Sequence, residues 1–157
     1  GSTALSIDGD NALIISEGNQ TITNGAAGTR IDGNNARIAN TGDISVDGAG
    51  SSAIIIDGSD AHLTQAGDLL VTHGATGITS DGQNNTAKNI GNATVRDEDS
   101  IGFSITGKKN TFNNKGNIDI SLNGTGAQIS GEDTTVNLDG DINITAEKDS
   151  NGLFRGA

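Results

Sequence analysis

Two glycine landmarks recur along the whole chain at alternating intervals of 24 and 25 residues. The first is a glycine after a short polar residue, and the second lies nine residues later and precedes Asn or Asp. The first set is Gly9, Gly33, Gly58, Gly82, Gly107 and Gly131, and the second set is Gly18, Gly42, Gly67, Gly91, Gly116 and Gly140. A period held through six copies indicates a repeat array.

Each repeat contains three short stretches in which apolar and polar residues alternate, as in a strand with one buried face. This alternation predicts inward columns with one residue per repeat. The first stretch has Leu5, Thr29, Ile54, Ile78, Phe103 and Ala127, then Ile7, Ile31, Ile56, Ser80, Ile105 and Ile129. The second has Ala12, Ala36, Ala61, Asn85, Asn110 and Thr134, then Ile14, Ile38, Leu63, Ala87, Phe112 and Val136. The third has Gln20, Ile44, Leu69, Ala93, Ile118 and Ile142, then Ile22, Val46, Val71, Val95, Ile120 and Ile144.

Glycine and asparagine every few residues, with many β-branched residues, oppose long helices. The pattern predicts an all-β fold, a right-handed parallel β-solenoid of about six coils of 24–25 residues with three short strands each. Coils spaced about 4.8 Å apart would form a rod roughly 29 Å long. We predict one solenoid domain at residues 4–150, with residues 1–3 as a tag remnant and residues 151–157 as a fading repeat or C-terminal cap.

Composition and charge exclude several functions. The chain has no Pro, Cys, Met, Trp or Tyr and only three Phe, so neither a wide core nor a disulfide or thiolate metal site is expected. The formal charge of −11 opposes contact with nucleic acid, which needs clustered Lys or Arg. No apolar run approaches the roughly 20 residues of a membrane span, so we expect no direct membrane insertion by this segment.

The repeat reads G-apolar-x-I-D-G-x-N-A-x-apolar-x-N-x-G-D-I-x-V, best seen from Ala53 to Val71 and, more degraded, from Gly102 to Ile120. Over residues 4 to about 145 it resembles the passenger repeats of bacterial type V secreted surface proteins, the autotransporter adhesin family. The resemblance implies a bacterial cell-surface or secreted location and a role in adhesion, self-association, virulence or biofilm formation. The implied partner is a host surface molecule or another copy of the chain.

The spacing between the third stretch and the next first stretch varies, which predicts tolerant loops at residues 47–52, 72–76, 96–101, 121–125 and 145–151. The candidate interaction surface combines outward strand positions with the acidic loop of the fourth repeat: Arg37, Ser45, Thr64, Thr72, Thr94, Asp97, Glu98, Asp99 and Asn113. We expect no catalytic residues and no cofactor. The alternative is a β-helical polysaccharide-binding or polysaccharide-degrading protein, in which two loop carboxylates would have to stand at a set separation.

Several residues raise the question of metal binding. Asp8, Asp32, Asp57 and Asp81 form one column, and a bound calcium ion would relieve their repulsion in a calcium-organised stalk. The column continues as Thr106 and Ser130, and the Gly-Gly-x-Gly-x-Asp calcium repeat is absent, so we predict solvated carboxylates and no metal site. His62 and His73 are predicted surface residues. The Asn/Asp column from Asn19 to Asp141 is expected to cap amides at the bends.

Overall fold

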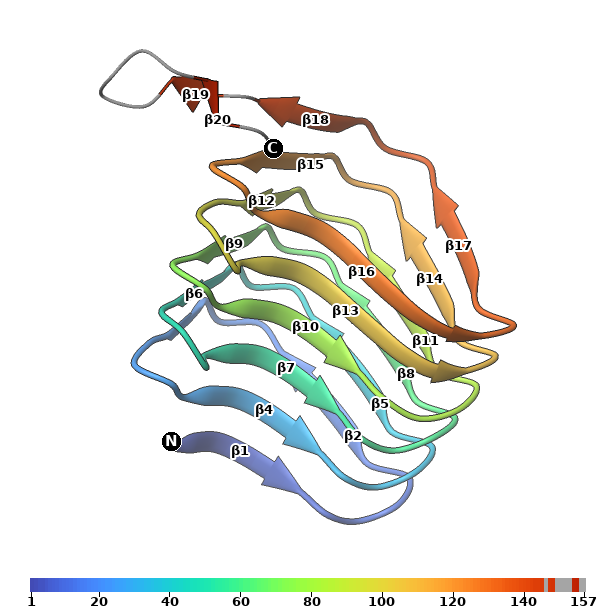
Figure 1. The fold of residues 1–157 in the computed structure, drawn as a ribbon. Coiled ribbons are helices and arrows are strands. Elements are labelled where there is room, and N and C mark those ends of the chain that lie inside the picture. The colour runs from blue at the N-terminus through green and yellow to red at the C-terminus, as the bar shows by residue number, and fades with distance from the viewer. Residues whose placement is uncertain (146, 149–153, 156–157) are drawn as a thin grey trace.

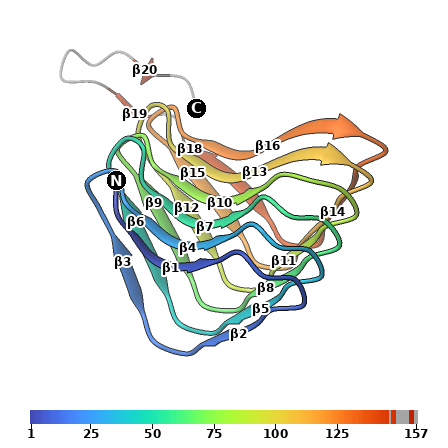
Figure 2. The ribbon, with the colours of Figure 1, turned by 90° about the horizontal axis from the view of Figure 1, so that it is seen from below.

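The computed structural model describes residues 1–145, 147–148 and 154–155. The chain forms three parallel six-stranded sheets wound into a solenoid with a triangular cross-section (Figures 1 and 2). In Figure 2, which looks from the N-terminal end, the chain turns clockwise as it recedes, so the solenoid is right-handed. The predicted right-handed parallel β-solenoid with three strands per coil is confirmed.

Each sheet takes one strand from every coil. The first sheet contains β1 (Thr3–Ile7), β4 (Ala27–Ile31), β7 (Ser52–Ile56), β10 (Thr76–Ser80), β13 (Ile101–Lys108) and β16 (Thr125–Glu132). The second contains β2 (Leu13–Ser16), β5 (Arg37–Asn40), β8 (His62–Gln65), β11 (Thr86–Asn89), β14 (Thr111–Asn114) and β17 (Thr135–Leu138). The third contains β3 (Gln20–Ile22), β6 (Ile44–Asp47), β9 (Leu69–Thr72), β12 (Ala93–Val95), β15 (Ile118–Ser121) and β18 (Ile142–Thr145).

The strand register confirms the predicted inward columns. Ile78 pairs with Ile54 on one side and with Phe103 on the other, and all three side chains are at most 1% exposed. Phe103 of the first sheet meets Phe112 of the second sheet across the interior, with ring centroids 4.8 Å apart. The columns are most exposed in the first and last described coils, where Leu5, Ile129, Val136, Ile142 and Ile144 are 36–63% exposed.

The interior contains a column of side-chain amides that the sequence analysis missed. The last position of each strand in the second sheet forms this column: Ser16, Asn40, Gln65, Asn89, Asn114 and Leu138. The four amide residues are at most 1% exposed. Asn40 Nδ2 donates to the Gly42 carbonyl at 2.7 Å and to Gln65 Oε1 at 2.8 Å, and Asn89 Nδ2 donates to Asn114 Oδ1 at 2.8 Å. These amides therefore connect stacked coils to each other and to the carbonyls of the bends.

A second polar column confirms the predicted amide caps, which act between coils. The backbone N–H of Asp43 donates to Asn19 Oδ1 at 2.9 Å, and that of Asp68 donates to Asp43 Oδ1 at 2.9 Å. The same bond recurs in each later coil as far as Asp141. The glycine before each cap is required by close stacking, because a Cβ on Gly67 would lie 2.2 Å from the Gly42 carbonyl oxygen.

The end of the chain departs from the coil pattern. β19 (Glu147–Lys148) and β20 (Phe154–Arg155) pair with each other in an antiparallel ribbon. The rest of the predicted cap at residues 151–157 lies outside the described residues, so the domain boundaries stay predictions. Within the described part of the chain, no helix is long and apolar enough to cross a membrane.

Candidate functional site

The corners that join the third sheet to the first are the most varied part of each coil. Short corners place two adjacent residues in the left-handed region, as at His73 (φ 52°) and Gly74 (φ 77°). In longer corners, the two left-handed residues are separated by one residue, as at Asp97 (φ 72°) and Asp99 (φ 63°). Short and long corners alternate along the chain, and this produces the 24- and 25-residue periods. They coincide with the loops predicted at residues 47–52, 72–76, 96–101 and 121–125, whereas part of the loop predicted at residues 145–151 lies outside the described residues.

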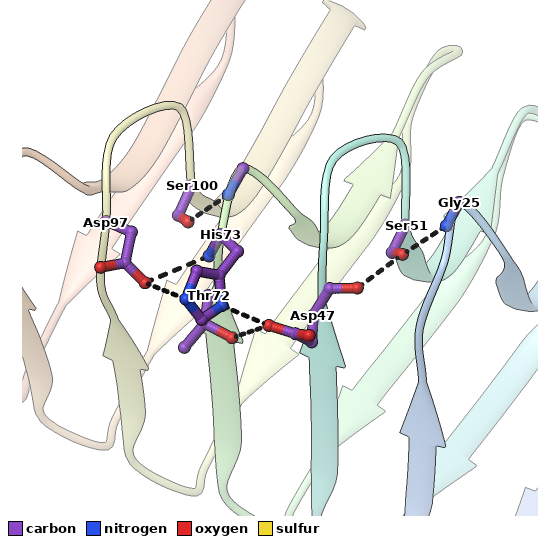
Figure 3. Close-up of polar contacts among 8 residues, drawn as sticks. Gly25, Asp47, Ser51, Thr72, His73, Asp97 and Ser100 are labelled. Carbon is purple, nitrogen blue, oxygen red and sulfur yellow. Dashed lines mark hydrogen bonds and ion pairs between the residues drawn. The ribbon is translucent and has the colours of Figure 1, made fainter.

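A buried serine fastens each longer corner to the shorter corner of the coil before it. Ser51 Oγ donates to the Asp47 carbonyl at 2.8 Å and accepts the N–H of Gly25 at 3.0 Å. Ser100 Oγ accepts the N–H of Gly74 at 3.0 Å in the same way (Figure 3). Both serines are at most 1% exposed, so the corner backbones are held in place beneath the surface side chains.

Above these serines lies a group that we call the histidine corner: Asp47, Thr72, His73 and Asp97. Its members come from three successive coils, and Figure 3 shows the His73 ring between the two carboxylates. His73 Nδ1 lies 2.5 Å from Asp47 Oδ1, and Nε2 lies 3.7 Å from Asp97 Oδ2. The backbone N–H of His73 donates to Asp97 Oδ2 at 3.2 Å, and Thr72 Oγ1 donates to Asp47 Oδ1 at 2.7 Å.

These contacts shift the ionisation of the corner. The hydrogen bond with Asp47 raises the pKa of His73, and the negative charges of Asp47 and Asp97 raise it further. The hydrogen bond from Thr72 lowers the pKa of Asp47, with a second contribution from His73. The imidazolium form of His73 is therefore favoured, and it bridges the carboxylates of the two coils on either side of its own. Because His73 is 71% exposed, solvent screens this interaction.

We predict that the histidine corner makes stability depend on pH. A raised folded pKa means that the contribution of His73 is complete below its unfolded pKa near 6.5 and is lost as pH rises through the folded value. The contribution of Asp47 is present above its unfolded pKa near 3.8 and is lost as pH falls through the lowered value. The urea midpoint of the wild type should therefore fall between pH 6 and pH 8.5.

The matched comparison is His73→Asn against His62→Asn, since asparagine tolerates a positive φ. His73→Asn should lose most of the fall in midpoint, whereas His62→Asn, on the exposed face of β8, should keep it. Equal pH dependence in the two variants would contradict the assignment to His73.

A cation that the sequence analysis missed lies beside the predicted aspartate column. Arg30 Nε lies 3.0 Å from Asp32 Oδ1, and the guanidinium also pairs with Asp57 of the next coil. The hydrogen bond to Asp32 raises the pKa of Arg30, while burial raises the pKa of Asp57 and the charge of Arg30 counteracts that rise. Arg30 thus relieves part of the repulsion between Asp32 and Asp57. Among the described residues, no group of three or more His, Asp or Glu is arranged to hold a metal.

The nine predicted surface positions fall on two sheets and one corner. The second sheet carries Arg37, Thr64 and Asn113, the third carries Ser45, Thr72 and Thr94, and the corner after β12 carries Asp97, Glu98 and Asp99. Two of them, Thr72 and Asp97, belong to the histidine corner. Thr72 donates to Asp47 there, and Asp97 accepts the backbone N–H of His73. Their role in binding stays a prediction. The 25-residue step from Asp47 to Thr72 was the available signal for this cluster.

In comparisons with known proteins, no family model, no curated protein and no solved structure matches the chain.

Proposed function

We propose that this chain is an adhesive rod of a bacterial surface protein, which contacts a host surface molecule or another copy through the outer face of its third sheet. The proposed surface location rests on the likeness of its repeats to type V passenger repeats. The outer face supports the adhesive role because its central positions form one continuous row: Thr21, Ser45, Leu70, Thr94, Asp119 and Asn143.

The observation that carries the proposal is a shallow depression along this row. It is lined by Thr21, Asp43, Ser45, Leu70, Thr94 and Arg96, among others, and it runs over the first four coils. Leu70 is 38% exposed and supplies an apolar contact, while hydroxyl and carboxylate groups supply hydrogen-bonding positions around it. Two predicted surface residues, Ser45 and Thr94, belong to this lining.

A long shallow surface favours many weak contacts over one tight site. The interior columns hold the strands in register, so the outer groups repeat at the coil spacing of about 4.8 Å. One rod would bind weakly, but many parallel rods on a cell would convert weak contacts into stable attachment through effective concentration. This is the behaviour expected of an adhesin without a deep pocket.

The test displays the chain on bacterial cells and measures clumping and attachment to host cells. Ser45→Glu with Thr94→Glu adds charge beside Asp43 and Asp68 and should reduce clumping or attachment about tenfold or more, because avidity multiplies each weakened contact. The matched control is Thr79→Glu with Ser104→Glu, outward neighbours on the first sheet, which should change neither property. Melting curves of all variants should agree with the wild type.

Two results would overturn the proposal. Equal clumping and attachment by both double variants and the wild type would show that the third-sheet face is not the contact surface. Cleavage of a polysaccharide by the purified chain, abolished by Asp97→Asn or Asp99→Asn, would instead establish the polysaccharide-degrading alternative.

A further inference from the structure

The strands of the second sheet carry positive charge and no carboxylate. Among the described strands, Asp47 and Asp119 lie in the third sheet and Glu132 lies in the first, whereas the six strands of the second sheet contain no Asp or Glu. The second sheet instead contains Arg37 and Lys88. In a chain with a net charge of −11, the outer face of this sheet is therefore the part of the surface best suited to an anion.

The two cations of this face are available to a ligand. In the first sheet, Arg30 pairs with two aspartates, and Lys108 pairs with Glu132 at 2.8 Å. Within the described part of the chain, neither Arg37 nor Lys88 forms an ion pair. Their charges are therefore balanced by solvent alone and can pair with charges of a bound molecule.

Arg37, His62 and Lys88 form an oblique line across three successive coils. Arg37 and His62 are register partners at the first position of β5 and β8. Lys88 of β11 is the register partner of Thr64, which lies two positions after His62. The line spans two coil steps, or about 10 Å along the rod. Each of these three coils has a described coil on both sides (Figure 1).

A shallow groove follows this line, and we call it the second-sheet groove. It consists of two adjoining depressions that share the exposed residues Arg37 and His62 in their linings. Ala39 and Thr64 line one depression, and their short side chains leave space between the longer ones. Lys88 lies in the next strand beside Thr64, so a positive charge is present toward each end of the groove.

The other depression has a rim of short polar side chains. Asn35, Asp60 and Asn84 line it, all three are exposed, and their φ angles are 56°, 58° and 57°. This repeated left-handed conformation places one amide or carboxylate per coil at the same corner, where Asn84 Nδ2 donates to Asp60 Oδ1 at 3.2 Å. Amides both donate and accept hydrogen bonds, and a carboxylate accepts them, so the rim matches the hydroxyl groups of sugars.

We propose that the second-sheet groove binds a glycan chain with widely spaced carboxylates, in which charged and neutral sugars alternate. Arg37 holds one carboxylate through two parallel N–H···O bonds, which the planar guanidinium favours. Lys88 contacts a second carboxylate further along the chain, and the corner amides bond to hydroxyl groups. This contact does not rest on the proposed adhesive role of the third sheet.

Charge density favours such a glycan over nucleic acid. A DNA duplex carries one negative charge per about 1.7 Å of its axis, whereas the two cations of the groove lie about 10 Å apart. Asp60 in the lining would repel a dense polyanion. An acidic peptide is disfavoured because the anchors of protein interfaces are large side chains in well-packed pockets, and this groove is shallow and polar.

The experiment is a titration of the whole ¹⁵N-labelled chain with oligomers of hyaluronan, in which every second sugar carries one carboxylate, followed by NMR at about 0.15 M salt. Shift changes should concentrate in β5, β8, β11 and the corners before them. Oligomers whose carboxylates have been reduced to alcohols should bind about tenfold more weakly or less, because they lose the charge-assisted bonds.

Matched variants test the two cations. Arg37→Gln should weaken binding of the hyaluronan oligomers about tenfold, and Lys88→Gln should weaken it about threefold or more. Arg96→Gln removes the same charge beside the third sheet and should bind like the wild type, because charges farther than about 8 Å are screened at this ionic strength. The amide spectra of the free variants should match that of the wild type outside the substituted site.

Four results would overturn the proposal: no shift changes at any oligomer concentration, equal binding of the carboxyl-reduced oligomers, equal affinities of Arg37→Gln and Arg96→Gln, or tighter binding of single-stranded DNA. Tighter binding of chondroitin sulfate would also overturn it, because the preferred group would then be a sulfate. The Ser45→Glu, Thr94→Glu variant should bind hyaluronan like the wild type. Failure of the groove and failure of the adhesive third-sheet face are therefore distinguishable.

Discussion

Replacing Val71 with Asp should unfold the rod or cost about 4 kcal/mol or more of its stability, the largest effect expected of any substitution considered. Val71 is fully buried, pairs with Val46 and Val95, and lies within 3.1 Å of the position where a Cβ on Gly77 would be. A carboxylate there would have no cation or water to solvate it in the narrow interior. Urea denaturation followed by circular dichroism would measure the loss.

The matched control is Leu70→Asp, one residue away on the outer face and 38% exposed. It should change the urea midpoint little, because the new carboxylate remains in water. Thr72→Asp is less suitable as a control, although Thr72 also lies on the outer face, because Thr72 Oγ1 donates to Asp47 and the variant would disturb the histidine corner. Equal losses in the Val71→Asp and Leu70→Asp variants would contradict the assignment of faces.

Replacing Asn114 with Leu should lower the free energy of unfolding by about 1–3 kcal/mol, although it makes the interior more apolar. Asn114 is fully buried, its Nδ2 donates to the Gly116 carbonyl, and its Oδ1 accepts from Asn89 Nδ2 at 2.8 Å. Leucine would remove the donor to the Gly116 carbonyl and the acceptor for one N–H of Asn89, whose Nδ2 would keep only its bond to the Gly91 carbonyl. Its shape is compatible with the column, since Leu138 occupies the next position in register.

The control is Asn113→Leu, the outward neighbour, whose Oδ1 accepts one exposed hydrogen bond from Asn137. It should cost much less than Asn114→Leu in the same urea titration. If Asn114→Leu instead stabilises the chain, the interior amides serve only to fill space, and the coupling between the bends and the amide column is wrong.

Both predictions follow from the near one-dimensional stacking of the solenoid. Each coil contacts the coils above and below it, so stability is approximately a sum of coil and interface contributions. A defect at Val71 or Asn114 disrupts two interfaces at once because each lies in an interior coil with neighbours on both sides. The same substitution in a coil with one described neighbour would disrupt one described interface.

The sequence alone determined the fold and most of the core. The glycine period indicated the number of coils, and the two-residue alternation assigned Val71, Ile78 and Phe103 to the interior, where the structure places them. It could do so because the alternation of inward and outward residues along a strand is a local property, and the repeat shows the same alternation in six copies. Asn40 and Asn114 were missed because asparagine is typical of bends. Without their hydrogen-bond partners, these two residues could not be assigned to the interior.

Only the tertiary structure decided which residues meet between coils. His73 contacts Asp47 and Asp97 because the corners have particular lengths and because His73 and Asp97 themselves have positive φ. Neither property can be read from the repeat period. The link from Arg30 to Asp57 likewise joins residues 27 positions apart. Sequence period determines what lies in a column, but register and corner geometry determine what each column touches.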